Sequence, residues 1–124
     1  MIEIDLNSIF DSLKLKSLIV EDYSASTLLL TILLKGYSRE ILEVRNGDEA
    51  VEVCKKHKGI DLITMDLQIA GNGFEATRQI RKFNRGVVII AQSAYAMAHD
   101  KEKALYVGCK ILSLSRFRGM NLYD

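Results

Sequence analysis

The chain has 124 residues, of which 48% are hydrophobic and 27% are charged, as is ordinary for one globular domain. Its 17 basic and 16 acidic side chains nearly balance, which argues against partners such as nucleic acid or a membrane surface. No apolar run approaches the roughly 20 residues needed to cross a bilayer, and the first residues lack the layout of a secretory signal. We therefore expect a cytoplasmic protein.

Short apolar runs alternate with helical patterns along most of the chain. We expect strands at 16–20, 40–44, 61–65, 86–91 and 109–114, and helices at 24–37, 46–59, 73–83 and 97–108. Ser24 is expected to cap the first of these helices and Gly36 to stop it, and the second is expected to end at Gly59. The run at 86–91 is the most continuously apolar, so we expect it at the centre of the sheet.

Five strands that alternate with helices predict an α/β fold with a parallel sheet and helices on both faces. In such sheets ligands bind beyond the carboxyl ends of the strands, where the strand order reverses. Residues directly after the strands are therefore the candidates for function.

Residues 1–14 form an extension before the domain that we assign to 15–124. Leu6, Ile9, Phe10 and Leu13 fall at helical spacing and predict a short amphipathic helix. Its apolar stripe would cover an apolar surface of the domain or pair with another chain, and a frayed extension is the alternative.

Cys54 and Cys109 stand far apart in the sequence, without neighbours at metal-ligand spacing. We expect two reduced and buried thiols.

Acidic side chains follow two of the expected strands. Glu21 and Asp22 come after the first strand and Asp66 after the third, so the three meet if these strands are neighbours. Two like charges ~4 Å apart repel by about 4 kcal/mol at an effective dielectric near 20. Such a cluster either raises its pKa values or holds a cation, and oxygen ligands around an open site suit Mg²⁺. A lone acid after a strand is more often a helix cap or a surface charge. Ser93, after the fourth strand, lies at the same rim or caps the next helix.

The stretches "LIVEDYSAS", "NGDEAVEV", "DLITMDLQ", "NGFEATRQIRKF" and "VVIIAQSAYAMAHDKEKAL" carry a family resemblance. With the 44 positions from Asp22 to Asp66, the chain from about Leu15 to Lys110 resembles a response-regulator receiver domain of two-component signalling. The resemblance implies a five-stranded sheet in the flavodoxin-like order 2-1-3-4-5, which is known for receivers and is carried over from them.

The resemblance also implies site residues. Asp66 would accept a phosphoryl group from a histidine kinase or a phosphotransfer protein. Glu21, Asp22 and Asp66, with the backbone carbonyl of Gln68, would hold Mg²⁺, and Ser93 would be the switch hydroxyl. The implied function is that of a phosphorelay receiver whose phosphorylation switches a surface for a downstream protein partner. A homodimer through an exposed apolar surface is a further expectation.

Three departures from the family pattern stand out. The loop "IAGNG" lacks the usual proline and is one residue short, although the glycine after Asn72 still offers backbone freedom for a loop-to-helix turn. The family's lysine, 22 positions after the switch hydroxyl, falls on Ser115, with Arg116 as an uncertain substitute. The tail "SRFRGMNLYD" is too short for the usual last helix, so the part from about 111 is atypical and that helix is missing or malformed. Suitably chosen codons yield the usual endings in another reading frame, which makes a frameshift one hypothesis for these departures.

These departures leave other functions open. A degenerate receiver would act as a phosphorylation-independent protein-binding module. A free-standing phosphohydrolase is disfavoured, because Gln68 stands where such enzymes generally need a second acid. We expect no enzyme beyond self-phosphorylation and self-dephosphorylation.

Overall fold

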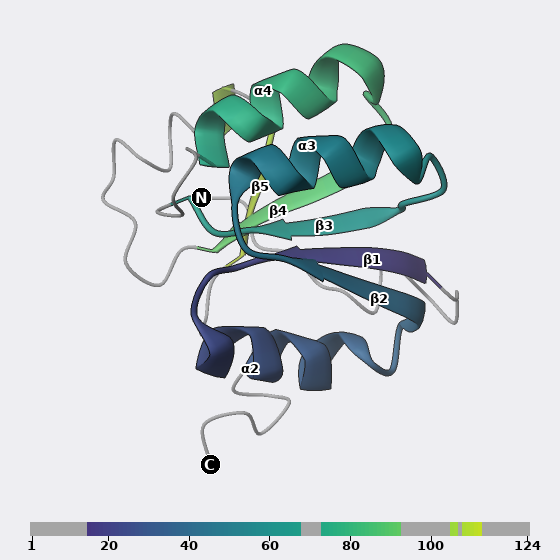
Figure 1. Cartoon of the computed structure of the whole chain (residues 1–124), viewed down its shortest axis with the longest axis vertical. Coiled ribbons are helices and arrows are strands. Elements are labelled where there is room, and N and C mark those ends of the chain that lie inside the picture. The colour runs from purple at the N-terminus through teal and green to yellow at the C-terminus, as the bar shows by residue number, and fades with distance from the viewer. Residues whose placement is uncertain (1–14, 68–72, 93–104, 107, 113–124) are drawn as a thin grey trace.

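The computed structural model describes residues 15–67, 73–92, 105–106 and 108–112. These residues form a parallel sheet that lies between two layers of helices (Figure 1). The elements, in chain order, are β1 (Leu15–Val20), α2 (Ser24–Leu34), β2 (Ser38–Val44), α3 (Gly47–Lys56), β3 (Leu62–Met65), α4 (Gly73–Phe83), β4 (Val88–Gln92) and β5 (Lys110–Leu112).

The strands follow the order β2-β1-β3-β4-β5, and every neighbouring pair is parallel. The predicted flavodoxin-like α/β sheet is therefore confirmed. The expectation that the run at 86–91 forms the centre of the sheet is wrong, because β3 is the central strand. All four residues of β3 are buried, but its Thr64 interrupts the apolar run, so apolar continuity alone pointed to the wrong strand.

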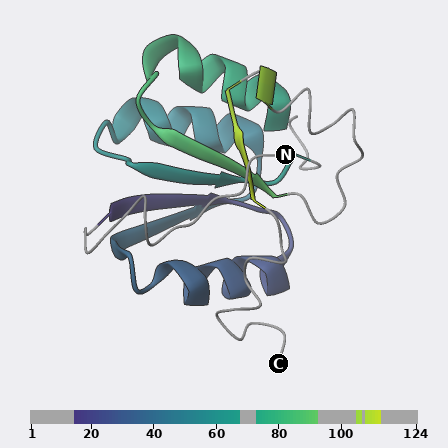
Figure 2. The same ribbon diagram turned by 180° about the vertical axis from the view of Figure 1, so that it is seen from behind.

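Helices cover both faces of the sheet, with α2 on one side and α3 and α4 on the other (Figures 1 and 2). Because successive strand residues point to opposite faces, β1, β3 and β4 each supply both layers of the core. The layer on the α2 face includes Ile19, Leu30, Leu33, Leu34, Leu62 and Ile90. The layer under α3 and α4 includes Leu18, Val20, Ala50, Cys54, Ile63, Met65, Ala76, Ile80 and Ile89.

Two helix starts differ in how they are capped. Asn46 precedes α3, and its side chain accepts a hydrogen bond from the backbone N–H of Glu49 at 2.8 Å. The prediction that Ser24 caps the first helix is wrong. Ser24 is already helical, and Tyr23 occupies the cap position without a side-chain hydrogen bond. An extended Tyr23 lets the chain leave β1 and turn into α2 one residue earlier than the capping preference suggested.

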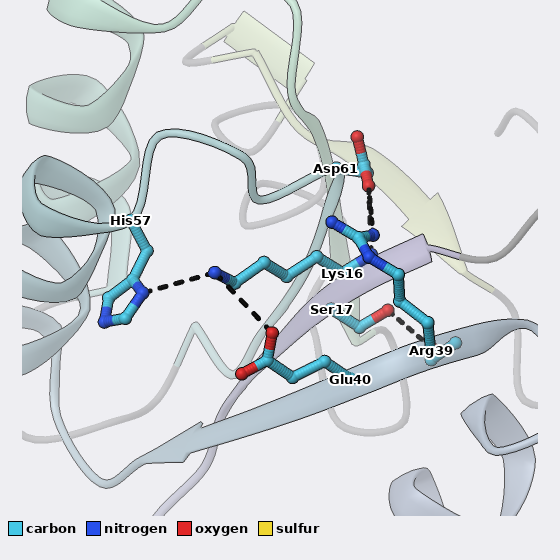
Figure 3. Close-up of polar contacts among 7 residues, drawn as sticks. Lys16, Ser17, Arg39, Glu40, His57 and Asp61 are labelled. Carbon is cyan, nitrogen blue, oxygen red and sulfur yellow. Dashed lines mark hydrogen bonds and ion pairs between the residues drawn. The ribbon is translucent and has the colours of Figure 1, made fainter.

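The amino ends of β1, β2 and β3 are tied together by polar side chains (Figure 3). Lys16 lies 3.2 Å from His57 Nδ1 and 3.6 Å from Glu40 Oε1 through its Nζ. Its backbone N–H donates to Asp61 Oδ2 at 2.9 Å, and Arg39 Nη1 lies 3.7 Å from the same oxygen. These contacts fix the edge of the sheet opposite to the one at which ligands are expected.

Several predictions concern residues outside the described part of the chain. They include the helix in the 1–14 extension, most of the helix at 97–108, and the tail from 113 onward with its missing or malformed last helix. Within the described part, Cys54 and Cys109 are free and buried as expected. None of the described helices is long and apolar enough to span a membrane.

Candidate metal centre

The three acids that follow β1 and β3 meet at the carboxyl edge of the sheet. Val20 pairs with Met65 at the end of the two strands, so the residues that come next leave the sheet at the same place. One carboxylate oxygen from each of Glu21, Asp22 and Asp66 lies within 4.8 Å of the others. The predicted convergence is therefore confirmed.

Backbone hydrogen bonds hold this cluster in place. The N–H of Asp66 donates to the carbonyl of Val20 at 3.1 Å, and the N–H of Glu21 donates to the carbonyl of Val44 at 3.1 Å. The three acids differ in solvent exposure: Asp22 is exposed, Asp66 is half-buried and Glu21 is only 5% exposed. The acids are thus held at the strand ends by the backbone, and Asp66 remains accessible to solvent.

The pKa of Glu21 reflects both its burial and the negative charges beside it. The pKa of Glu21 is raised from 4.5 to about 7, mainly by burial and then by the charge of Asp66, a hydrogen bond with that side chain and the charge of Asp22. The N–H of Tyr23, which donates to Glu21 Oε1 at 3.2 Å, opposes the shift. Three carboxylates that repel one another at short range are a favourable site for a hard divalent cation such as Mg²⁺, which prefers oxygen ligands.

Gly73 lets α4 begin directly against the backbone of Asp66. A Cβ atom at Gly73 would lie 2.7 Å from the carbonyl oxygen of Asp66 and 3.0 Å from Leu67 Cα. The sequence suggested that this glycine supplies backbone freedom. Its φ angle is not in the left-handed region, and close approach is the reason that the structure gives.

An open groove of about 480 Å³ lies beside the acids, between α2 and the end of β2. It is lined by Glu21, Asp22, Ser24, Thr27, Leu28, Thr31, Glu43, Val44 and Arg45. Arg45 reaches across it, and its Nη2 donates to the backbone carbonyl of Asp22 at 3.1 Å. Sequence reasoning missed Arg45, because an arginine after a strand reads as an ordinary surface charge.

The other predicted site residues, Gln68, Ser93, Ser115 and Arg116, lie outside the described residues. Their roles stay predictions.

With this geometry in place, comparison with known proteins identifies the family. The family model described as the response regulator receiver domain matches residues 17–112 of the sequence. The chain therefore belongs to the response regulator receiver domains of two-component signalling, which are signalling modules.

Individual relatives agree with this assignment. The polar-differentiation response regulator DivK of Brucella anthropi is 33% identical over 108 residues, covering 81% of this chain and 87% of DivK. A co-crystal structure of the Saccharomyces cerevisiae phosphotransfer protein Ypd1 and the receiver domain of Ssk1 matches with a TM-score of 0.72. That match has 32% identity and covers 86% of each chain.

A third relative carries a metal. The receiver domain of sensor histidine kinase PA1611 from Pseudomonas aeruginosa PAO1 was solved with a magnesium ion coordinated in its active site cleft. It has a TM-score of 0.70 and 27% identity, and the match covers 90% of this chain and 99% of that one.

Proposed function

We propose that this chain accepts a phosphoryl group on Asp66 from a histidine kinase or a histidine phosphotransfer protein, and thereby switches a protein-interaction surface. The convergence of three carboxylates from two neighbouring strand ends is the observation that carries the proposal. The Ssk1 receiver, solved with its phosphotransfer protein, supports this class of donor. The cytoplasmic location and the downstream partner stay predictions.

Asp66 is the nucleophile in this proposal. One carboxylate oxygen bonds to phosphorus as the bond between phosphorus and the donor's histidine nitrogen breaks, and the electron pair of that bond returns to the imidazole. The hydrogen bond from Asp66 N–H to Val20 and the contact with Gly73 hold the attacking group still, so little orientation has to be gained during the reaction.

Glu21, Asp22 and Asp66 would hold the cation, with the carbonyl of Gln68 as a further ligand. Bound Mg²⁺ would neutralise negative charge on the phosphoryl oxygens. The chain's own part is to bring the three carboxylates together at the strand ends and to leave Asp66 open to solvent.

The degenerate receiver remains the second candidate, since Ser115 stands at the position of the family's lysine. Such a module would bind a protein partner without becoming phosphorylated.

Treatment with acetyl phosphate separates the two. With Mg²⁺, the intact protein is expected to gain the mass of one phosphoryl group in an acid-stable, base-labile linkage. EDTA and Asp66→Asn should each abolish the gain, while Asp48→Asn, which removes an exposed carboxylate in the first turn of α3, should retain it. Mg²⁺ binding without any adduct would instead favour the degenerate module, and continued release of phosphate over many turnovers would favour a phosphohydrolase.

A further inference from the structure

Arg45 joins the end of β2 to the loop that carries Asp22. It follows Val44, the last residue of β2, and its Nη2 donates to the carbonyl oxygen of Asp22 at 3.1 Å. The contact joins residues 23 positions apart in the sequence, so it crosses from one strand end to the next.

The backbone of Arg45 is itself held by the start of α3. Its N–H donates to Glu49 Oε1 at 2.9 Å, while the N–H of Glu49 donates to Asn46 Oδ1 at 2.8 Å. These reciprocal bonds form a helix cap that reaches one residue further back than the usual capping box. The backbone of Arg45 is therefore fixed, which limits the range of positions that its guanidinium group can reach.

The rest of the acidic loop is anchored at the residues on either side of Asp22. Glu21 N–H donates to Val44 at 3.1 Å, and Tyr23 N–H donates to Glu21 Oε1 at 3.2 Å. Asp22 itself is exposed, so packing restrains it little. The guanidinium on its carbonyl is the contact that fixes the peptide group between Asp22 and Tyr23, directly after the acidic pair.

We propose that Arg45 is a positioning residue for the metal centre: it holds the Asp22 backbone so that the carboxylates of Glu21 and Asp22 face the cation together. The inference rests on the proposed function and adds to it a residue that touches neither the cation nor the phosphoryl group. Contacts that orient metal ligands commonly change metal affinity by 10-fold or more.

The charge of Arg45 acts in the opposite direction. A cation beside the cluster repels Mg²⁺, so a purely electrostatic role predicts tighter metal binding when Arg45 becomes neutral. A positioning role predicts weaker binding. The sign of the change therefore separates the two effects.

The test is a calorimetric titration of the full-length protein with Mg²⁺ at low ionic strength. Arg45→Met is expected to weaken Mg²⁺ binding by about tenfold. Arg45→Lys keeps the charge and one donor, and should recover part of the affinity. Arg78→Met is the matched control, because it removes an exposed arginine paired with Glu75 on α4, and should bind Mg²⁺ as the unmodified protein does.

A second measurement excludes a general loss of structure. Urea unfolding in EDTA should show Arg45→Met close to the unmodified protein, and phosphorylation by acetyl phosphate should recover at saturating Mg²⁺. Unchanged or tighter Mg²⁺ binding by Arg45→Met would overturn the inference while leaving the proposed function intact. Absence of Mg²⁺ binding in the unmodified protein would instead remove the proposed function itself.

Discussion

Thr64, in the central strand β3, places a hydroxyl inside the core. It is 2% exposed, and its Oγ1 has no hydrogen-bond partner among the described residues. Its register partners are Ile19 on β1 and Ile90 on β4, so its neighbours across the sheet are apolar. A buried hydroxyl without a partner costs stability that a methyl group of similar shape would not.

We therefore expect Thr64→Val to raise the free energy of unfolding by about 1 kcal/mol in urea denaturation. Thr77→Val is the matched comparison, because the Thr77 hydroxyl donates to Gly73 O at 2.9 Å and lies 3.7 Å from Cys109 Sγ. That variant should lose stability by a similar amount. Destabilisation by both changes would show that the hydroxyl of Thr64 is satisfied in solution.

Glu21 gives the metal-free protein a characteristic pH dependence. Its pKa in the folded state is raised from 4.5 to about 7, first by burial and then by Asp66. Between these values the folded protein keeps a proton that the unfolded chain has released. Stability from this group is thus fully present below the lower value and is lost as the pH rises through the upper one.

Urea unfolding in EDTA at several pH values checks this prediction. The free energy of unfolding should fall from pH 5 to pH 8, and Glu21→Gln should flatten that slope and be the more stable protein above pH 7. Glu43→Gln, which changes an exposed glutamate in the same groove, should keep the slope. Equal slopes for the unmodified protein and Glu21→Gln would count against the assignment.

At the residue scale, the sequence predicted the three acids because position after a parallel strand is enough to place them. It did not predict the contact between Gly73 and Asp66 or the reach of Arg45 to Asp22. Both depend on how separate elements approach one another, which a local pattern does not encode.

Arg81 connects several elements on the side of the sheet away from α2. Its Nη1 donates to the carbonyls of Asn84, Arg85 and Val87 at 3.3, 3.2 and 2.6 Å, and its Nη2 to that of Gly108 at 2.8 Å. Gly108 has φ +104°, and a Cβ atom there would lie 2.8 Å from Arg81 Nε. One guanidinium thus fastens the end of α4 to the chain before β4 and before β5.

Arg81→Met is expected to lower the free energy of unfolding by about 2 kcal/mol, because several carbonyls lose a charged donor at once. Arg81→Lys should recover only a part, since a lysine cannot present a planar fork. Chemical denaturation measures both, with Arg78→Met as the exposed control on the same helix. An Arg81→Met protein as stable as that control would mean that water replaces the guanidinium without loss.

Element ends were less predictable than element types. The second strand was expected over 40–44 but begins at Ser38, and the helix that was expected to end at Gly59 ends at Lys56. Tyr37 lies outside α2 because its carbonyl accepts from Leu15 N–H at 2.8 Å, which draws it toward the sheet. Tertiary hydrogen bonds of this kind set the boundaries, and the apolar period does not reveal them.

For the molecule as a whole, exposed apolar side chains of the described residues gather on and directly before α2. Tyr23, Leu28 and Ile32 are 64%, 62% and 56% exposed. We propose that the amphipathic stretch of the 1–14 extension covers this face. Removal of residues 1–13 should then lower the melting temperature by about 4 °C, which corresponds to roughly 1 kcal/mol.

Scanning calorimetry at two protein concentrations checks the deletion. A melting temperature that depends on concentration would indicate that the face pairs with a second copy of the chain. An unchanged melting temperature at both concentrations would leave the extension without a covering role. The matched change is Leu28→Ser in the full-length chain, which should reproduce part of the loss if the extension packs there.

The pairing of the outer strand β2 with β1 contains a register shift. Leu15 pairs with Ser38 and Lys16 with Glu40, so the register shifts by one residue at Arg39, and Arg39, Glu40 and Glu43 are exposed. An unbroken outer strand offers a template on which foreign polypeptide can be added, as in fibril growth. The extra residue and the charges make β2 a poor template for such addition, as is common for the outer strands of natural sheets.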